Sequence, residues 1–218
     1  NFAVIITPAN KVDEIKKLVI RIVNIEEFST ILTLNDISPV EASGAPVFNT
    51  NPYLKLNGRG VLVGVIDTGI DYTHPAFRNS DGTTRIEYIY DLNNGGKVYN
   101  KTQINEALKL TDPYSMVNST DVTGHGTHVV GIACAGGEID KQYYGVAPES
   151  SIAMVKVSRS RFALSTQIMK GIKFLIDKGK ELNMPLAINM SLSTNDGAHN
   201  GSSLLEQYIS TVSAIERV

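Results

Sequence analysis

Two residues of this chain have the types and surroundings that acid–base catalysis requires. Asp67 follows directly on the apolar run 61–66, and His125 lies in a glycine-rich stretch, 124–131, whose small residues let a helix begin close against neighbouring backbone. An imidazole with an ordinary pKa near about 6.5 can accept and return a proton near neutral pH. A carboxylate beside it would fix its tautomer and stabilise the imidazolium, which is the arrangement that activates a serine hydroxyl.

Two other chemistries are less consistent with these residues. Asp-Thr-Gly also begins the catalytic loops of aspartic proteases, but their dyad needs a second copy and the chain has only the one at 67–69. His125 and His128 could bind zinc, but a zinc site needs a third ligand and usually a His-Glu-x-x-His pattern, which is absent. We therefore predict structural roles for the other histidines, with His128 packed against the sheet and His74 and His199 in loops.

The hydrophobic pattern predicts the scaffold that positions the pair. The run 61–66 is near-continuously apolar, as expected for a strand buried on both faces of a parallel sheet, and 152–157 and 186–190 repeat the type. Between the last two, residues 165 to about 182 have the periodicity of an amphipathic helix. Strands that alternate with a helix predict an α/β domain, in which a carboxylate at the C-terminal end of a strand lies at the ligand crevice.

Three segments fall outside this alternation. Residues 2 to about 34 predict a small strand–helix–strand unit, which is too small to be stable alone. Residues 35–60 are rich in Pro, Asn, Ser and Gly and predict a linker or an extended surface segment. Residues 88–119 predict an insertion on the α/β frame, with a hairpin-type turn at 93–96 and a short helix at 100–109.

Composition limits the partners of the protein. Lys+Arg number 20 and Asp+Glu number 22, so the net charge is −2, and no basic block favours nucleic acid or an anionic membrane surface. No apolar run approaches the roughly 20 residues of a membrane span. We therefore expect neither nucleic acid nor a membrane as a partner. The single cysteine, Cys134, excludes an internal disulfide and is predicted to be a small buried side chain on a helix.

Three motifs resemble signatures of the subtilisin-like serine protease family, the subtilases, and occur in that family's order. Residues 61–77 (VLVGVIDTGIDYTHPAF) resemble its Asp signature, 124–133 (GHGTHVVGIA) its His signature, and 189–192 (NMSL) its substrate-binding strand. The resemblance covers residue 58 to the end of the chain. It implies a subtilisin-like three-layer α/β fold with a parallel central sheet, incomplete in this chain.

The resemblance also assigns roles to residues. It implies that Asp67 is the orienting carboxylate, that His125 is the general base, and that the chain is the N-terminal portion of a serine endopeptidase. The substrate would be a protein or peptide whose backbone pairs with the substrate-binding residues Ser191, Leu192 and Ser193. Ser193 stands where the family strand normally has glycine, which puts the preference for the side chain beside the cut bond in doubt.

The resemblance divides the chain into two parts. Residues 1–40 are similar to the last part of a subtilase propeptide, a partial α+β unit, and 41–218 to the N-terminal part of the catalytic domain. The propeptide would itself be a partner of the enzyme, because such segments assist folding and are then cut off, here within 35–46. The family nucleophile, in a Gly-Thr-Ser motif, is expected beyond Val218, so this chain alone should be inactive.

A narrower resemblance concerns the predicted insertion. Residues 81–86 and 103–108 are similar to the branch that contains bacterial spore-germination proteases, which implies a bacterial spore or secreted location and, as substrate, a cortex-lytic proenzyme. Some relatives in that branch are pseudoproteases, so the alternative is a non-catalytic scaffold that acts in binding or signalling. No cofactor is evident; subtilases often bind calcium, but the spacing of carboxylates such as Asp81 and Asp121 assigns no such site.

Overall fold

A central sheet of mostly parallel strands organises the molecule. The computed structural model describes residues 11, 14–15, 33–34, 44–137, 139–158, 165–193 and 200–216. In these residues one sheet has five strands in the order β4-β3-β5-β2-β6, and only β4 is antiparallel to its neighbour. The strands are β2 (Leu62–Asp67), β3 (Ile86–Asp91), β4 (Lys97–Asn100), β5 (Ser151–Lys156) and β6 (Leu186–Asn189). The predicted α/β class with a parallel sheet is confirmed.

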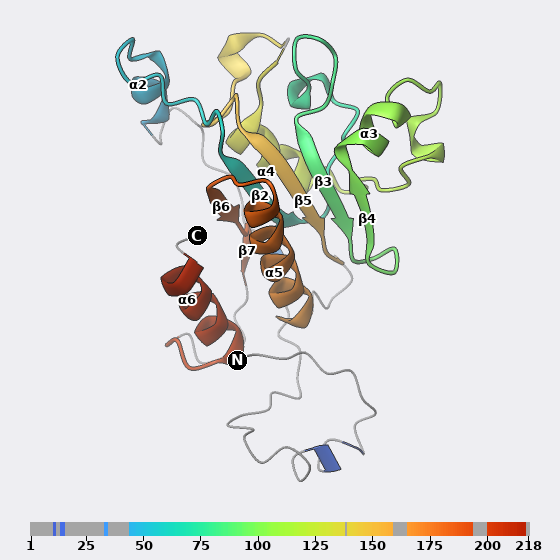
Figure 1. The fold of residues 1–218 in the computed structure, drawn as a ribbon, viewed down its shortest axis with the longest axis vertical. Coiled ribbons are helices and arrows are strands. Elements are labelled where there is room, and N and C mark those ends of the chain that lie inside the picture. The colour runs from blue at the N-terminus through green and yellow to red at the C-terminus, as the bar shows by residue number, and fades with distance from the viewer. Residues whose placement is uncertain are drawn as a thin grey trace.

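Helices cover both faces of this sheet (Figure 1). Helix α4 (His125–Cys134) lies on one face, and α5 (Ser165–Glu181) lies on the other with α6 (Leu204–Glu216) packed against it. Successive side chains of β2 point to opposite faces of the sheet. Since helices cover both faces (Figure 1), the strand is buried along its whole length. Val63 and Val65 join the apolar cluster under α4, and Leu62 and Ile66 join the one under α5. Asp67, at the end of this strand, is therefore held from both sides.

A buried arginine forms hydrogen bonds to three separate segments of the chain, one of which is the end of α4. Arg85 is only 6% exposed and donates hydrogen bonds to the backbone carbonyls of Ala76, Cys134 and Ser150. These acceptors belong to the short 3₁₀ helix η3 (Pro75–Phe77), to the end of α4 and to the residue before β5. Burial lowers the pKa of the guanidinium, while the three carbonyl acceptors stabilise its charged form.

The segment predicted as an insertion contributes to the central sheet. Its first residues lie in β3, which pairs in parallel with β5, so the frame continues to Asp91. The predicted turn follows, since β3 and β4 form an antiparallel hairpin, and α3 (Lys101–Ala107) begins at a capping box of Asn100 and Gln103. The 3₁₀ helices η4 (Pro113–Ser115) and η5 (Lys141–Tyr143) lie further along the chain.

The segment 35–60, predicted to be a linker or an extended surface segment, is not extended throughout its described part. Within its described part, helix α2 (Ala45–Thr50) forms with a proline in its first turn, where the missing amide hydrogen has no helical partner to lose. Ahead of it, β1 (Thr33–Leu34) pairs antiparallel with β7 (Leu192–Ser193). Most of residues 1–40 lie outside the described residues, so the strand–helix–strand prediction stays a prediction. Among the described residues, no helix is both long and apolar enough to cross a membrane.

Candidate active site

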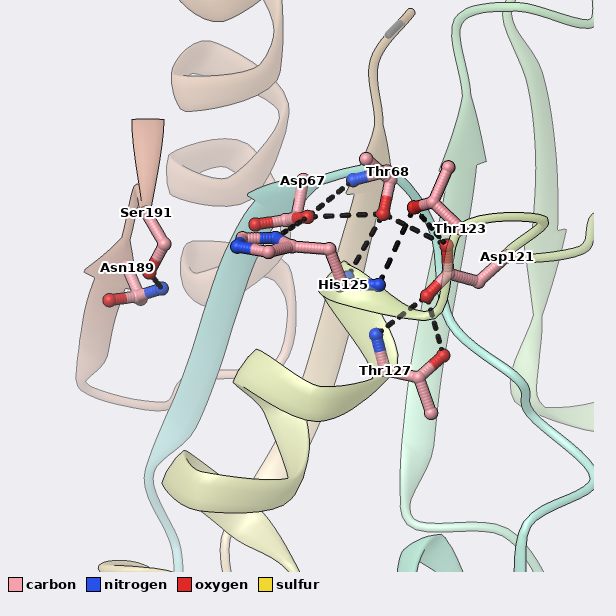
Figure 2. Close-up of polar contacts among 9 residues, drawn as sticks. Asp67, Thr68, Asp121, Thr123, His125, Thr127, Asn189 and Ser191 are labelled. Atoms are coloured by element: carbon pink, nitrogen blue, oxygen red, sulfur yellow. Dashed lines mark hydrogen bonds and ion pairs between the residues drawn. The ribbon is translucent and has the colours of Figure 1, made fainter. Parts of the chain in front are cut away.

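Asp67 and His125 meet at the C-terminal edge of the sheet. Asp67 is the last residue of β2 and is fully buried, and His125 is the first residue of α4. The imidazole Nδ1 lies 2.8 Å from Asp67 Oδ1 (Figure 2). The backbone amide of Thr68 donates to the same oxygen at 2.7 Å. The two side chains, which the sequence predicts to lie together at a strand end, are therefore in contact there.

Two glycines let the helix begin this close to the strand. Gly124 precedes α4 with a φ of 76°, a left-handed conformation that side chains other than glycine rarely adopt. A Cβ on Gly126 would lie 2.2 Å from the carbonyl oxygen of Gly69, so only glycine allows this approach. The third glycine of the motif, Gly131, has nothing within 4 Å of its Cβ position and has no such packing role.

The hydrogen bond to Asp67 determines what His125 can do. A proton on Nδ1 is donated to the carboxylate, so Nε2 keeps the lone pair that accepts a proton. The His125 side chain is 18% exposed while that of Asp67 is 0% exposed, so the ring reaches from a buried partner to the surface. If Nε2 gains a proton, the ionised carboxylate stabilises the resulting cation, which is the role of the aspartate in Asp-His-Ser triads.

A second carboxylate, Asp121, lies beside the pair. Its Oδ1 accepts hydrogen bonds from the hydroxyls of Thr68, at 2.8 Å, and Thr123, at 3.2 Å. Its Oδ2 accepts from the amide and the hydroxyl of Thr127, at 2.8 and 2.7 Å. Burial raises the pKa of the Asp121 carboxyl, but these hydrogen bonds together outweigh it and leave the pKa below its usual value. In the sequence, the one sign that Asp121 lies beside the pair is its position four residues before His125.

The predicted substrate-binding residues follow the edge strand β6. Asn189 ends β6 and is the register partner of Val65 in β2. The chain therefore leaves β6 at the C-terminal end of the parallel strands, where Asp67 also lies. The Asn189 amide donates to the Ser191 hydroxyl at 2.9 Å (Figure 2). Ser191 and Leu192 are half-buried, and the side chain of Ser193 lies outside the described part of the chain.

The other predicted residues are placed as follows. Cys134 is fully buried at the end of α4, as predicted, and His74 caps η3 by accepting from the amide of Ala76. The prediction for His128 was wrong. It is exposed and lines a cavity of about 660 Å³, because the sheet-facing positions of α4 are taken by smaller residues such as Val129. His199 lies outside the described residues. No group of three or more His, Cys, Asp or Glu side chains in the described ranges could hold a metal ion.

The fold is that of a subtilisin-like protein, and the chain belongs to the subtilase family, whose model matches residues 58–217. The structure of the Clostridium perfringens CspB protease is similar to it at 59% identity and a TM-score of 0.75, over 80% of this chain and 38% of that one. The S41 psychrophilic protease has 26% identity and a TM-score of 0.53, over 79% of this chain and 48% of that one.

Curated sequences show the same relationship. A subtilisin from Bacillus sp. (strain TA39) is 31% identical over 139 residues, which are 63% of this chain and 28% of that protein. The minor extracellular protease Vpr of Bacillus subtilis (strain 168) is 26% identical over 178 residues, which are 80% of this chain and 20% of Vpr. The chain thus spans less than a third of the length of these two curated relatives.

Proposed function

We propose that this chain is the N-terminal part of a subtilisin-like serine endopeptidase, with Asp67 and His125 as two members of its catalytic triad. The observation that carries the proposal is the 2.8 Å contact between His125 Nδ1 and Asp67 Oδ1, made at the end of a fully buried parallel strand. The serine and the oxyanion donors would come from a further part of the protein. That expectation is supported by the small share of its relatives that the chain spans.

The chemistry follows from the hydrogen bond. Nε2 of His125 accepts the serine proton as the serine oxygen attacks the peptide carbonyl, and Asp67 stabilises the imidazolium. The same proton then goes to the nitrogen of the leaving amine as the peptide bond breaks. In the second half, His125 takes a proton from water as the water oxygen attacks the acyl carbon, and returns it to the serine oxygen as the bond between that oxygen and the acyl carbon breaks and the acid product leaves. The histidine and the serine end in their starting states.

The substrate would pair with the strand that contains Ser191, Leu192 and Ser193. Within the described residues, the backbone of β7 is paired antiparallel with Thr33 and Leu34, in the way an extended peptide adds to a sheet edge. This pairing supports the proposal that residues 1–40 are a propeptide segment that lies on its own substrate strand, with 41–218 forming the catalytic part. The cut between them is proposed to fall within 35–46.

The biological setting is also a proposal. The similarity of residues 81–86 and 103–108 to spore-germination proteases supports a bacterial spore protein that activates a cortex-lytic proenzyme by cleavage. The 59% identity with the CspB protease is consistent with a closely related enzyme.

A fluorophosphonate probe on the full-length protein tests the proposed function. The probe labels a serine only where a base activates it, so the wild type should label and His125→Gln should not. His128→Gln is the matched control, because His128 is exposed and lies three residues further along the same helix. Mass spectrometry of the purified protein should also find an N-terminus within 35–46. A full-length protein that never labels, even with the N-terminal segment removed, would establish the alternative of a non-catalytic scaffold.

A further inference from the structure

Asp121 joins the two elements that carry the catalytic pair. One of its oxygens accepts from the Thr68 hydroxyl, which directly follows Asp67, and the other accepts from the hydroxyl of Thr127, in the first turn of α4 (Figure 2). Thr68 is only 5% exposed, so this contact is shielded from water. The strand end and the helix start are therefore bonded to a single carboxylate that belongs to neither of them.

Each hydroxyl also accepts a backbone hydrogen bond from the opposite element. Thr68 Oγ1 accepts from the amide of Gly126 at 2.9 Å, and Thr127 Oγ1 accepts from the amide of Asp71 at 2.9 Å. A hydroxyl has one proton, and a carboxylate can only accept, so Asp121 draws both protons and leaves the lone pairs to the amides. The strand loop and the helix are thus cross-linked twice, and both links depend on Asp121.

The Thr68 hydroxyl has a competing acceptor. Its oxygen lies 3.2 Å from Asp67 Oδ1, compared with 2.8 Å from Asp121 Oδ1. That Asp67 oxygen already takes the hydrogen bonds of the Thr68 amide and of His125. If Asp121 could not accept, the hydroxyl proton would turn to Asp67 and weaken its bond to the imidazole.

We propose that Asp121 is a positioning residue of the catalytic pair. It holds the first turn of α4 against the loop after β2, and it keeps the Thr68 proton away from the oxygen that His125 needs. This inference rests on the proposed function for its kinetic consequence, and its structural consequence can be measured without any activity. The pKa of Asp121, which its hydrogen bonds lower, keeps the carboxyl ionised near neutral pH.

The test replaces Asp121 by asparagine in the full-length protein. The amide retains one acceptor oxygen and must turn its NH₂ toward one of the two hydroxyls, which then has to give its proton to a different acceptor, at nearly constant side-chain volume. We expect kcat on a peptide substrate to fall by about tenfold or more, with KM within about twofold, because the base is displaced while the substrate strand is untouched. The downfield proton resonance of His125 Nδ1–H should move upfield or exchange faster with water.

The control is a buried carboxylate that has no contact with the pair, although it is more buried than Asp121, which is partly exposed. Asp91 is 1% exposed and accepts from the Ser119 hydroxyl at 2.7 Å, at the end of β3. Asp91→Asn should lower the melting temperature but leave kcat and the His125 resonance unchanged. If Asp121→Asn behaves like Asp91→Asn in both readouts, the proposal is wrong and Asp121 contributes stability alone.

Variants of Thr68 keep the proposal testable if Asp121→Asn does not fold. Thr68→Ser preserves the hydroxyl and should preserve kcat and the resonance, whereas Thr68→Val should reproduce the loss. The double variant Thr68→Val, Asp121→Asn should be no worse than the more severe single variant, since both remove the same link. Additive losses would overturn the proposal. A protein that fails to label with fluorophosphonate refutes the proposed function, while the His125 resonance in Asp121→Asn still decides the role of Asp121.

Discussion

Replacing Gly126 by alanine should separate the two catalytic side chains without removing either. The added Cβ would lie 2.2 Å from the carbonyl oxygen of Gly69 and 3.1 Å from Asp67 Oδ1. The added Cβ is fixed to the backbone of α4 and the Gly69 oxygen is itself a backbone atom, so no side-chain rotation can relieve the contact. The start of α4 must therefore move by about 1 Å before the closer contact becomes an ordinary van der Waals separation of about 3.4 Å.

That displacement has two measurable effects. A shift of about 1 Å in a catalytic group costs about 100-fold in rate, so kcat of the full-length enzyme should fall by that order. Overpacking costs about 1–3 kcal/mol, which should lower the midpoint of urea unfolding followed by circular dichroism. Fluorophosphonate labelling should slow to a similar extent as kcat, because both need His125 within reach of the serine.

Gly131→Ala is the matched control on the same helix. Nothing lies within 4 Å of its Cβ position, and alanine favours a helix interior by roughly 0.5–1 kcal/mol over glycine. Gly131→Ala should thus leave kcat unchanged and raise the unfolding midpoint slightly. If Gly126→Ala matches Gly131→Ala in activity and stability, the close approach of α4 to the Gly69 backbone does not position the pair, and the geometric argument fails.

Three other predictions follow from the described contacts. Asp67→Asn should lower kcat by about 10,000-fold while the fold persists, since an amide neither fixes the His125 tautomer nor stabilises the imidazolium; a loss under tenfold in a steady-state peptide assay would contradict the assigned role. Arg85→Met should cost about 3 kcal/mol in urea unfolding because buried carbonyls lose a charged donor, whereas Arg59→Met should cost under about 1 kcal/mol because the side chain is 79% exposed in its ion pair; equal losses would refute the buried role. Burial raises the pKa of the Cys134 thiol to about 11, so at pH 8 it should react with a maleimide only after unfolding, and peptide mass spectrometry that finds rapid labelling of the native protein would exclude this environment.

The sequence predicted those parts of the fold that depend on periodicity and local chemistry. The strand at 61–66 and the helix at 165–182 appear as Leu62–Asp67 and Ser165–Glu181, because burial on both faces and amphipathicity leave strong patterns. The role of β3 was harder to predict. Polar residues within it, such as Glu87, hid a sheet strand at the start of the presumed insertion.

The candidate site could be predicted only in part for a related reason. Asp67 and His125 lie in contiguous motifs, whereas Asp121 acts through Thr68, 53 positions away, and such a contact leaves no local pattern. The prediction that His128 packs against the sheet was wrong, since the side chain is exposed. Residues three apart lie only about 60° apart around a helix, so the spacing cannot decide which of them faces the sheet; the orientation of α4, which buries Val129 and Val130, leaves His128 exposed.

The described hydrogen bonds that join Asp67 and His125 to each other and to their neighbours lie within residues 67–127. The strand end, the two glycines of the helix start and the Asp121 cross-links require no atom of a serine. A relative that lost its nucleophile would therefore keep this pair in the same geometry for structural reasons, because loosening it would unpair a buried carboxylate. The His125 proton resonance and fluorophosphonate labelling consequently report on different properties. The first measures whether the base is positioned, and the second measures whether a serine is there for it to activate.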